Sequence, residues 1–399
     1  MFCMARRVKR APHHEEYLTQ HATRKRSSLV THHVFSFPLV PRQYTAAVID
    51  TDEKLAAFLA TIRAASWVAL DTEADSLHAY PEKLCLIQIS TTSGDELIDP
   101  LARINLNPLL KALTVHELIM HGADYDLRLF RKHHQFVPET IFDTMLAARL
   151  LGQQQFSLTH LVAHYLGVML EKGSQKANWA RRPLTERMER YARNDTHYLK
   201  PLSDRLRSEL RDKARLEWHR ESCARLITDC ARNPEVNLDL AWRVKGSQAL
   251  SRPALAILRE LWHWRETEAV AANLPPYFIL SHELLIELST KAVDSHPIEP
   301  LLPARLSYRR RSGLVKAIQR GLGLPPHKHP EPLQRANRRP TDQERRRFRE
   351  LERRRNAHAA QLGVDPTLIA SRTALSDLSR NWDRHAPELM SWQRELSRR

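Results

Sequence analysis

The sequence predicts an α/β domain in a chain that is otherwise largely helical. Short apolar runs with strand-type alternation stand between stretches of helical periodicity in the first half of the chain. Only 10 glycines accompany a charged fraction of 27%, which is typical of helical proteins. With 399 residues, 42% of them hydrophobic, the chain is long enough for two or three domains that each bury a core.

Composition excludes several classes of protein. No window approaches 18 consecutive apolar residues, so we expect no membrane-spanning helix. The four cysteines form no CxxC pair and no zinc-ligand spacing; they are Cys3, Cys85, Cys223 and Cys230. This usage is cytosolic and provides no disulfide framework. We therefore expect a cytoplasmic protein.

The formal net charge of +16 is concentrated at the two flanks of the chain. Residues 301–360 contain 17 lysines and arginines against 5 acidic residues, and residues 1–45 contain 8 against 2. The region between them is close to neutral. Any single arginine is as easily part of a solvated helix face, but the whole segment predicts a surface for a polyanion.

Residues 1–45 contain proline, histidine and arginine without helical or strand periodicity, which predicts a basic, disordered arm. An organelle transit sequence is disfavoured by Glu15 and Glu16 and by the lack of an amphipathic face. A secretory signal is excluded because no apolar stretch follows Arg10. The histidine pairs in this arm fit exposed side chains better than metal ligands.

Order is expected to begin near Tyr44. Apolar residues at helical spacing follow an acidic start at 50–53, which predicts a capped helix. Strands are predicted at 67–75, 84–90, 96–99 and 118–121, with a turn at Ser93 and Gly94. Helices are predicted at 123–133, 142–151, 158–166 and about 185–213. This order predicts a mixed or antiparallel sheet covered by helices.

The run at 67–75, W-V-A-L-D-T-E-A-D, is a short apolar strand that ends in carboxylates. Asp71 and Glu73 are two apart and therefore point to the same side. Two carboxylates on one side repel each other, an arrangement that fits a multivalent cation between them. A solvated strand end with a turn at Thr72 would explain the pattern equally well.

Further acids stand at helix positions. Asp124 and Asp126 fall in the first turn of a predicted helix, where the helix dipole alone would favour them. Tyr191 and Asp195 are four apart and lie on one helix face, where a plain hydrogen bond would also account for the pair. Asp143 is predicted to be a helix N-cap.

Taken together, D-T-E at 71–73, H-x-A-x-x-D at 121–126 and Y-x-x-x-D at 191–195 resemble the three motifs of the DEDD exonuclease superfamily. The tyrosine marks the DEDDy branch. The segment 175–202 and I-F-D-T at 141–144 are similar to the ribonuclease D family in particular. The resemblance covers about 48–206 and implies a ribonuclease H-like, mixed-sheet exonuclease domain at 46–215.

The resemblance continues downstream. W-R-V-K-G at 242–246, a helix around Trp262 and Trp264, and the run at 275–285 resemble the helicase-and-ribonuclease-D C-terminal (HRDC) domain. A divergent second copy is signalled at 362–375, which echoes 275–285. The implied organisation is a first HRDC domain at 235–320, a basic linker at 321–337 and an HRDC-like domain at 338–399, with both HRDC domains small and all-α.

The resemblance also implies a site. Its metal ligands and catalytic residues are Asp71, Glu73, Asp126 and Asp195, with Tyr191 as a further catalytic residue. They would hold two divalent ions, Mg²⁺ or Mn²⁺. Asp71 would bridge both ions, Glu73 and Asp195 would hold the ion with the attacking water, and Tyr191 would orient that water. Asp126 would act at the other ion. The motif H-x-A-x-x-D matches Asp126 and not Asp124. Side chains two residues apart on a helix point in nearly opposite directions, so only one of these two acids can face the site.

The function implied is a 3′-5′ exoribonuclease that releases nucleoside 5′-monophosphates from single-stranded RNA 3′ ends, in the maturation of tRNA precursors. We expect a monomer without a membrane partner. Three alternatives stay open: a DNA exonuclease of the same superfamily, a non-catalytic RNA-binding scaffold and a basic DNA-compacting protein. The DNA exonuclease is disfavoured because the chain has no polymerase or helicase motif. The scaffold is disfavoured by the intact carboxylates, and the DNA-compacting protein by the near-neutral middle region.

Overall fold

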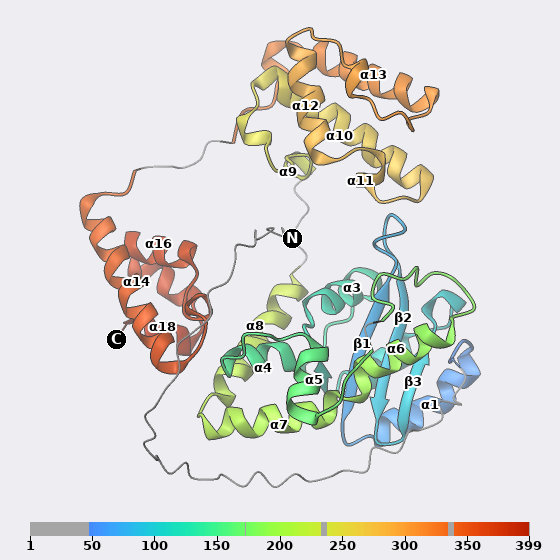
Figure 1. Cartoon of the computed structure of the whole chain (residues 1–399), viewed down its shortest axis with the longest axis vertical. Coiled ribbons are helices and arrows are strands. Elements are labelled where there is room, and N and C mark those ends of the chain that lie inside the picture. The colour runs from blue at the N-terminus through green and yellow to red at the C-terminus, as the bar shows by residue number, and fades with distance from the viewer. Residues whose placement is uncertain (1–47, 172, 233–237, 334–338, 399) are drawn as a thin grey trace, which may run out of the picture. The chain divides into compact units, whose positions relative to one another are not determined.

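The computed structural model of the chain describes residues 48–398, apart from 172, 233–237 and 334–338 (Figure 1). The basic arm predicted at 1–45 lies outside the described residues. No helix in the described ranges is both long enough and apolar enough to cross a membrane.

The first domain is built on a five-stranded mixed sheet with the order β3-β2-β1-β4-β5. Its strands are β1 (Val68–Ala74), β2 (Leu84–Thr91), β3 (Gly94–Ile98), β4 (Glu117–Met120) and β5 (Thr140–Asp143). β2 is antiparallel to β1 and β3, whereas β4 is parallel to β1 and to β5. Every residue of β2 is buried, as its apolar sequence requires of a strand covered on both faces. The mixed sheet is confirmed.

Helices cover both faces of this sheet. They are α1 (Asp52–Ala64), η1 (Pro100–Ala102), α2 (Asn107–Leu113), α3 (Asp124–His134), α4 (Thr144–Leu150), α5 (Leu158–Leu166), α6 (Glu186–His197), α7 (Leu199–Asp212) and α8 (Leu216–Ala231). Apolar residues of α1, α2, α3 and α8 pack together on one face. α6 crosses β1, β2 and β3 on the other face (Figure 1).

Two predicted helices differ from the structure. The helix predicted at 142–151 is wrong at its start, because Phe142 lies in β5 and the Asp143 side chain caps a helix that begins at Thr144. The helix predicted at 185–213 is broken at Tyr198 into α6 and α7. Pro201 explains the break: in a continuous helix it would supply no amide hydrogen and would clash with the carbonyl of His197.

The remainder of the described chain is helical. The first HRDC region contains α9 (Leu238–Ala241), η2 (Ser247–Ala249), α10 (Arg252–Ala272), α11 (Pro276–Ile279), α12 (His282–Val293), η3 (Glu299–Leu301), α13 (Tyr308–Leu322) and η4 (Pro326–Lys328). The second helical region, predicted to be HRDC-like, contains α14 (Asp342–Leu362), α15 (Pro366–Ile369), α16 (Arg372–Arg380), α17 (Trp382–His385), η5 (Ala386–Glu388) and α18 (Ser391–Arg398). The boundaries given above for the five segments of the chain stay predictions.

The two helical regions repeat one arrangement. In each, a 21-residue helix is followed by a four-residue helix that starts at proline and then by a helix capped by serine. A buried arginine of the long helix donates to a backbone carbonyl after the short helix: Arg265 to Leu280 at 3.3 Å and Arg355 to Ala370 at 3.0 Å. The sequence similarity between residues 275–285 and 362–375 therefore reflects a shared structure.

This arginine is expected to hold each region together. Arg355 is 8% exposed, so the Arg355→Ala change leaves the Ala370 carbonyl buried without its partner and should lower the free energy of unfolding by about 1–3 kcal/mol. Arg353→Ala is the control, because that side chain is 71% exposed on the same helix and should change stability by less than about 0.5 kcal/mol. Urea denaturation measures both. Equal losses would contradict a structural role for the buried guanidinium.

Candidate active site

β1 places two carboxylates on the face of the sheet that α6 covers. Asp71 lies opposite Gln88 of β2, and Glu73 lies opposite Leu86. Directly opposite residues of an antiparallel pair point to the same face. Leu86 packs in one cluster with Ala192 of α6. Asp71 and Glu73 therefore face α6, as the alternation along the strand predicts.

α6 brings Tyr191 and Asp195 to the same place, and the Tyr191 hydroxyl donates to the Asp195 carboxylate. Helix α6 is tied to β2 by the hydroxyl of Ser90, which donates to that of Thr196 at 2.7 Å. The segment before α6 packs on the tyrosine ring: a Cβ atom at Gly173 would lie 2.1 Å from Cδ2 of Tyr191. The ring has little room to move.

Asp126 comes from the segment that follows β4, on the side of β1 that pairs with β4. β4 pairs with β1 only through Val68 and Ala69, and the chain turns into α3 before it reaches the level of Asp71. The turn is held by the Asp143 carboxylate, which accepts from the amides of residues 122 and 123 at 3.2 and 2.8 Å. Asp126 is 6% exposed and accepts a hydrogen bond from the Thr72 hydroxyl.

The other two acids near the motifs lie outside this site. Asp124 points outward, with its side chain 58% exposed and paired to Arg128 at 2.9 Å. The hydrogen bond from Arg128 lowers the pKa of Asp124. Asp75 is buried, but it pairs with the Lys83 side chain and accepts from the Lys83 amide at 2.7 Å. The structure thus separates Asp126 from Asp124 as the motif match does.

The converging side chains form the carboxylate cluster, which consists of Asp71, Glu73, Asp126 and Asp195. Burial, and then the charges of the other three members, raise the pKa of Asp71 well above its usual value. Burial followed by the charges of Asp195 and Asp126 does the same for the pKa of Glu73. Chiefly through burial, the pKa of Asp126 and that of Asp195 rise to about 7. Such mutual effects require that the carboxylates share one site.

The donor set fits a divalent cation. In the described part of the chain, no three Asp, Glu, His or Cys side chains stand together as a preformed metal cluster. The carboxylate cluster is nevertheless close enough for its members to raise one another's pKa, and a cation would relieve that repulsion. Carboxylate oxygens are the ligands that Mg²⁺ and Mn²⁺ prefer.

Tyr191 has a different role from the acids. Burial, and then the charge of Asp195, raise its pKa above the usual value. The phenol therefore stays protonated at neutral pH, where it can donate a hydrogen bond but cannot act as a base.

Thr72 is a contributor that the sequence did not reveal, since it was interpreted only as a possible turn residue. The signal was its place between two carboxylates, where a hydroxyl can serve as a donor. Its bond to Asp126 links β1 to α3.

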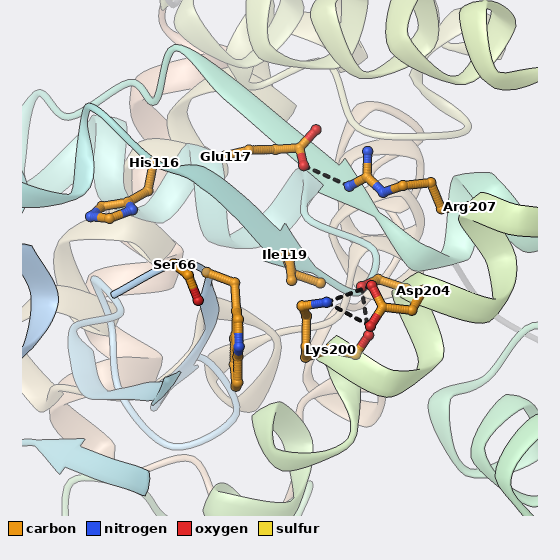
Figure 2. Close-up of a pocket in the computed structure, with 9 residues that line it drawn as sticks. Ser66, His116, Glu117, Ile119, Lys200, Asp204 and Arg207 are labelled. Atoms are coloured by element: carbon orange, nitrogen blue, oxygen red, sulfur yellow. Dashed lines mark hydrogen bonds and ion pairs between the residues drawn. The ribbon is translucent and has the colours of Figure 1, made fainter. Parts of the chain in front are cut away.

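A separate cavity of about 200 Å³ lies at the amino ends of β1 and β4, beside α7 (Figure 2). Its lining consists of Ser66, Trp67, His116, Glu117, Ile119, Lys200, Ser203, Asp204 and Arg207. Lys200 pairs with Asp204 at 2.5 Å and Arg207 with Glu117 at 2.6 Å. The cavity contains no member of the carboxylate cluster and is not the catalytic site.

Known proteins share this architecture. The family model described as 3′-5′ exonuclease matches residues 46–211, and that of the HRDC domain matches residues 254–295. The crystal structure of Escherichia coli RNase D, described as an exoribonuclease involved in structured RNA processing, superposes with a TM-score of 0.69 at 26% sequence identity. The match covers 88% of this chain and 96% of that chain.

Two curated relatives extend the comparison. Ribonuclease D of Jannaschia sp. (strain CCS1) is 31% identical over 291 residues, which cover 69% of this chain and 74% of the relative. Ribonuclease D of Granulibacter bethesdensis is 30% identical over 363 residues, which cover 88% and 90%. With an exonuclease domain that gathers the acids of all three motifs and an HRDC region behind it, the chain belongs to the ribonuclease D family of 3′-5′ exoribonucleases.

Proposed function

We propose that the carboxylate cluster holds two divalent ions, Mg²⁺ or Mn²⁺, and that the protein releases nucleoside 5′-monophosphates from the 3′ ends of tRNA precursors. The observation that carries this proposal is the convergence of four carboxylates from β1, α3 and α6, in which the charge of Asp126 raises the pKa of the other three. Two ions held by these carboxylates would supply an attacking hydroxide and neutralise the charge that grows on the phosphate and the leaving oxygen.

The roles of the individual residues follow from their neighbours. Asp71 is affected by all three other carboxylates, which suits a ligand shared between two ions. After burial, the charge of Asp195 contributes most to the raised pKa of Glu73, which supports a common ion for these two. Asp126 approaches from the opposite side, on α3, and would serve the second ion. Tyr191, protonated and bonded to Asp195, would orient the attacking water.

The HRDC regions would hold the body of a structured RNA. Helix α14 exposes Arg346, Arg347 and Arg349, whereas Arg345 pairs with Asp342, and Arg353 and Arg354 pair with Glu350. Cationic side chains on a helix face attract phosphates irrespective of sequence. The description of the E. coli relative as a processor of structured RNA supports this substrate class.

A cytoplasmic location and a monomeric state are part of the same proposal. Three of the cysteines, Cys85, Cys223 and Cys230, are free and buried, which is consistent with a reducing compartment.

The activity is tested by a time course on a 5′-labelled single-stranded RNA with Mg²⁺ or Mn²⁺. We expect a ladder that shortens from the 3′ end, that is abolished by EDTA and by a blocked 3′ end, and that is absent on the equivalent DNA. Equal digestion of DNA would indicate a broader exonuclease. Binding of RNA without digestion would indicate a scaffold.

Matched variants belong in the same experiment. Asp71→Asn and Asp126→Asn should each reduce turnover by more than about 100-fold, because each removes a proposed metal ligand, while circular dichroism shows a folded protein. Asp124→Asn, two residues from Asp126 but exposed, should remain fully active. Unfolding of Asp71→Asn would instead assign that carboxylate a structural role.

Metal binding should depend on pH. Because the pKa values of Asp126 and Asp195 are about 7 in the metal-free protein, both carboxyls are largely protonated at pH 6 and largely ionised at pH 8. A cation must displace these protons at the lower pH. Isothermal titration with Mn²⁺ should give a dissociation constant at least about tenfold larger at pH 6 than at pH 8. Equal affinities would contradict the coupling of protons to metal.

The basic surface is tested by replacing Arg346, Arg347 and Arg349 together with alanine. Binding to a tRNA-like RNA should weaken, and the slope of log affinity against log salt should become shallower by about 1 for each phosphate that is no longer neutralised. Turnover of a short oligomer should change little. The control replaces the three paired arginines Arg345, Arg353 and Arg354, which removes the same charge and should weaken binding less. Equal effects on the tRNA-like RNA and on the short oligomer would refute the proposal that α14 binds the RNA body while the carboxylate cluster acts on the 3′ end.

A further inference from the structure

One buried side chain in the floor of the site has no partner in the part of the chain that the structure describes. Gln88 is 0% exposed, and neither Oε1 nor Nε2 has a hydrogen-bond partner. A buried amide without partners is costly. Its neighbours on the same face have no such deficit, because Leu86 is apolar and Ser90 bonds to Asp95 and Thr196. The unmet bonding capacity of Gln88 therefore indicates a partner that the described residues do not supply.

The register of the sheet places this amide beside Asp71. The two residues are directly opposite in the β1–β2 pair, so their Cβ atoms are about 5 Å apart on one face. The flanking residues of that face both meet α6, Leu86 through the cluster with Ala192 and Ser90 through Thr196. Gln88 consequently lies beneath α6, next to the segment that carries Asp195.

We propose that Gln88 is a positioning residue for Asp71: when the Asp71 carboxylate binds a divalent ion, Nε2 of Gln88 donates to it and fixes its orientation. The inference rests on the proposed function of the carboxylate cluster. It explains why an amide is buried directly opposite Asp71 without a hydrogen-bond partner.

The chemistry of the site favours glutamine over other side chains at this position. A lysine or arginine would neutralise Asp71 and compete with the cation. A glutamate would add a fifth negative charge to a site whose members already repel each other. A leucine would supply no donor. Glutamine donates an N–H group without changing the net charge, and donors of this kind support metal affinity by about 10–100-fold.

The decisive variant is Gln88→Met, which keeps the length of the side chain and removes the amide group. We expect the dissociation constant for Mn²⁺, measured by isothermal titration, to rise by about tenfold or more. The metal-free variant should melt at the wild-type temperature or above it, because an unpaired buried amide has been removed. The matched control is Ile89→Val, the next residue of β2, which faces the opposite core; it should lower the melting temperature and leave Mn²⁺ affinity unchanged.

Wild-type Mn²⁺ affinity in Gln88→Met would overturn the proposal. If that variant does not fold, Gln88→Asn replaces it as the test: the amide is retained but withdrawn by one carbon, so Mn²⁺ should again bind more weakly, and wild-type affinity would again overturn the proposal. Asp71→Asn separates the two levels of inference. If Asp71→Asn also binds Mn²⁺ as the wild type does, the assignment of the metal ligands fails. If Asp71→Asn loses Mn²⁺ binding while Gln88→Met retains wild-type affinity, only the role proposed for Gln88 fails.

Discussion

The repulsion among four carboxylates, of which Asp126 is buried and the other three are half-buried, is the constraint on which the exonuclease domain depends. Bringing these groups together away from water is unfavourable, so the surrounding structure must hold them there. The β1–β2 pairing fixes the face of Asp71 and Glu73, and the Ser90–Thr196 bond keeps α6 against β2. The capped turn before α3 fixes Asp126. The first two contacts add no charge to the site, whereas the Asp143 carboxylate that caps the turn adds to the negative charge felt by Asp126.

The distribution of charge in the chain follows the same logic. A protein with a formal net charge of +16 carries the carboxylate cluster in a region of near-neutral composition. The arginines of α14 lie on the surface of a separate helical region. Cations within the carboxylate cluster would compete with divalent metal, whereas cations on a helix surface can attract RNA phosphates.

Much of this architecture could be predicted from the sequence, and the exceptions have physical causes. The alternation of β1 and the length of β2 made those strands evident, but Thr140–Asp143 is too short to establish a period, and β5 was missed. Helical spacing continues through Tyr198 and concealed the break that Pro201 imposes. The acids were recognisable from motif spacing. Thr72 and Gln88 were not, because an uncharged side chain gains its meaning from cross-strand register and from helix docking.

The repeated arginine-to-carbonyl bond of the two helical regions has a consequence for how such a protein can evolve. In each copy the framework depends on an internal contact, Arg265 to Leu280 or Arg355 to Ala370, and on serine caps rather than on the outer faces of the helices. Exposed positions of these helices, such as Arg346 and Arg347 of α14, can therefore change without breaking this contact. One copy can accumulate surface arginines, as α14 has done, while the other copy keeps different surface residues. Surface substitutions of this kind can change the range of RNAs bound without disturbing the fold of either helical region or the catalytic domain.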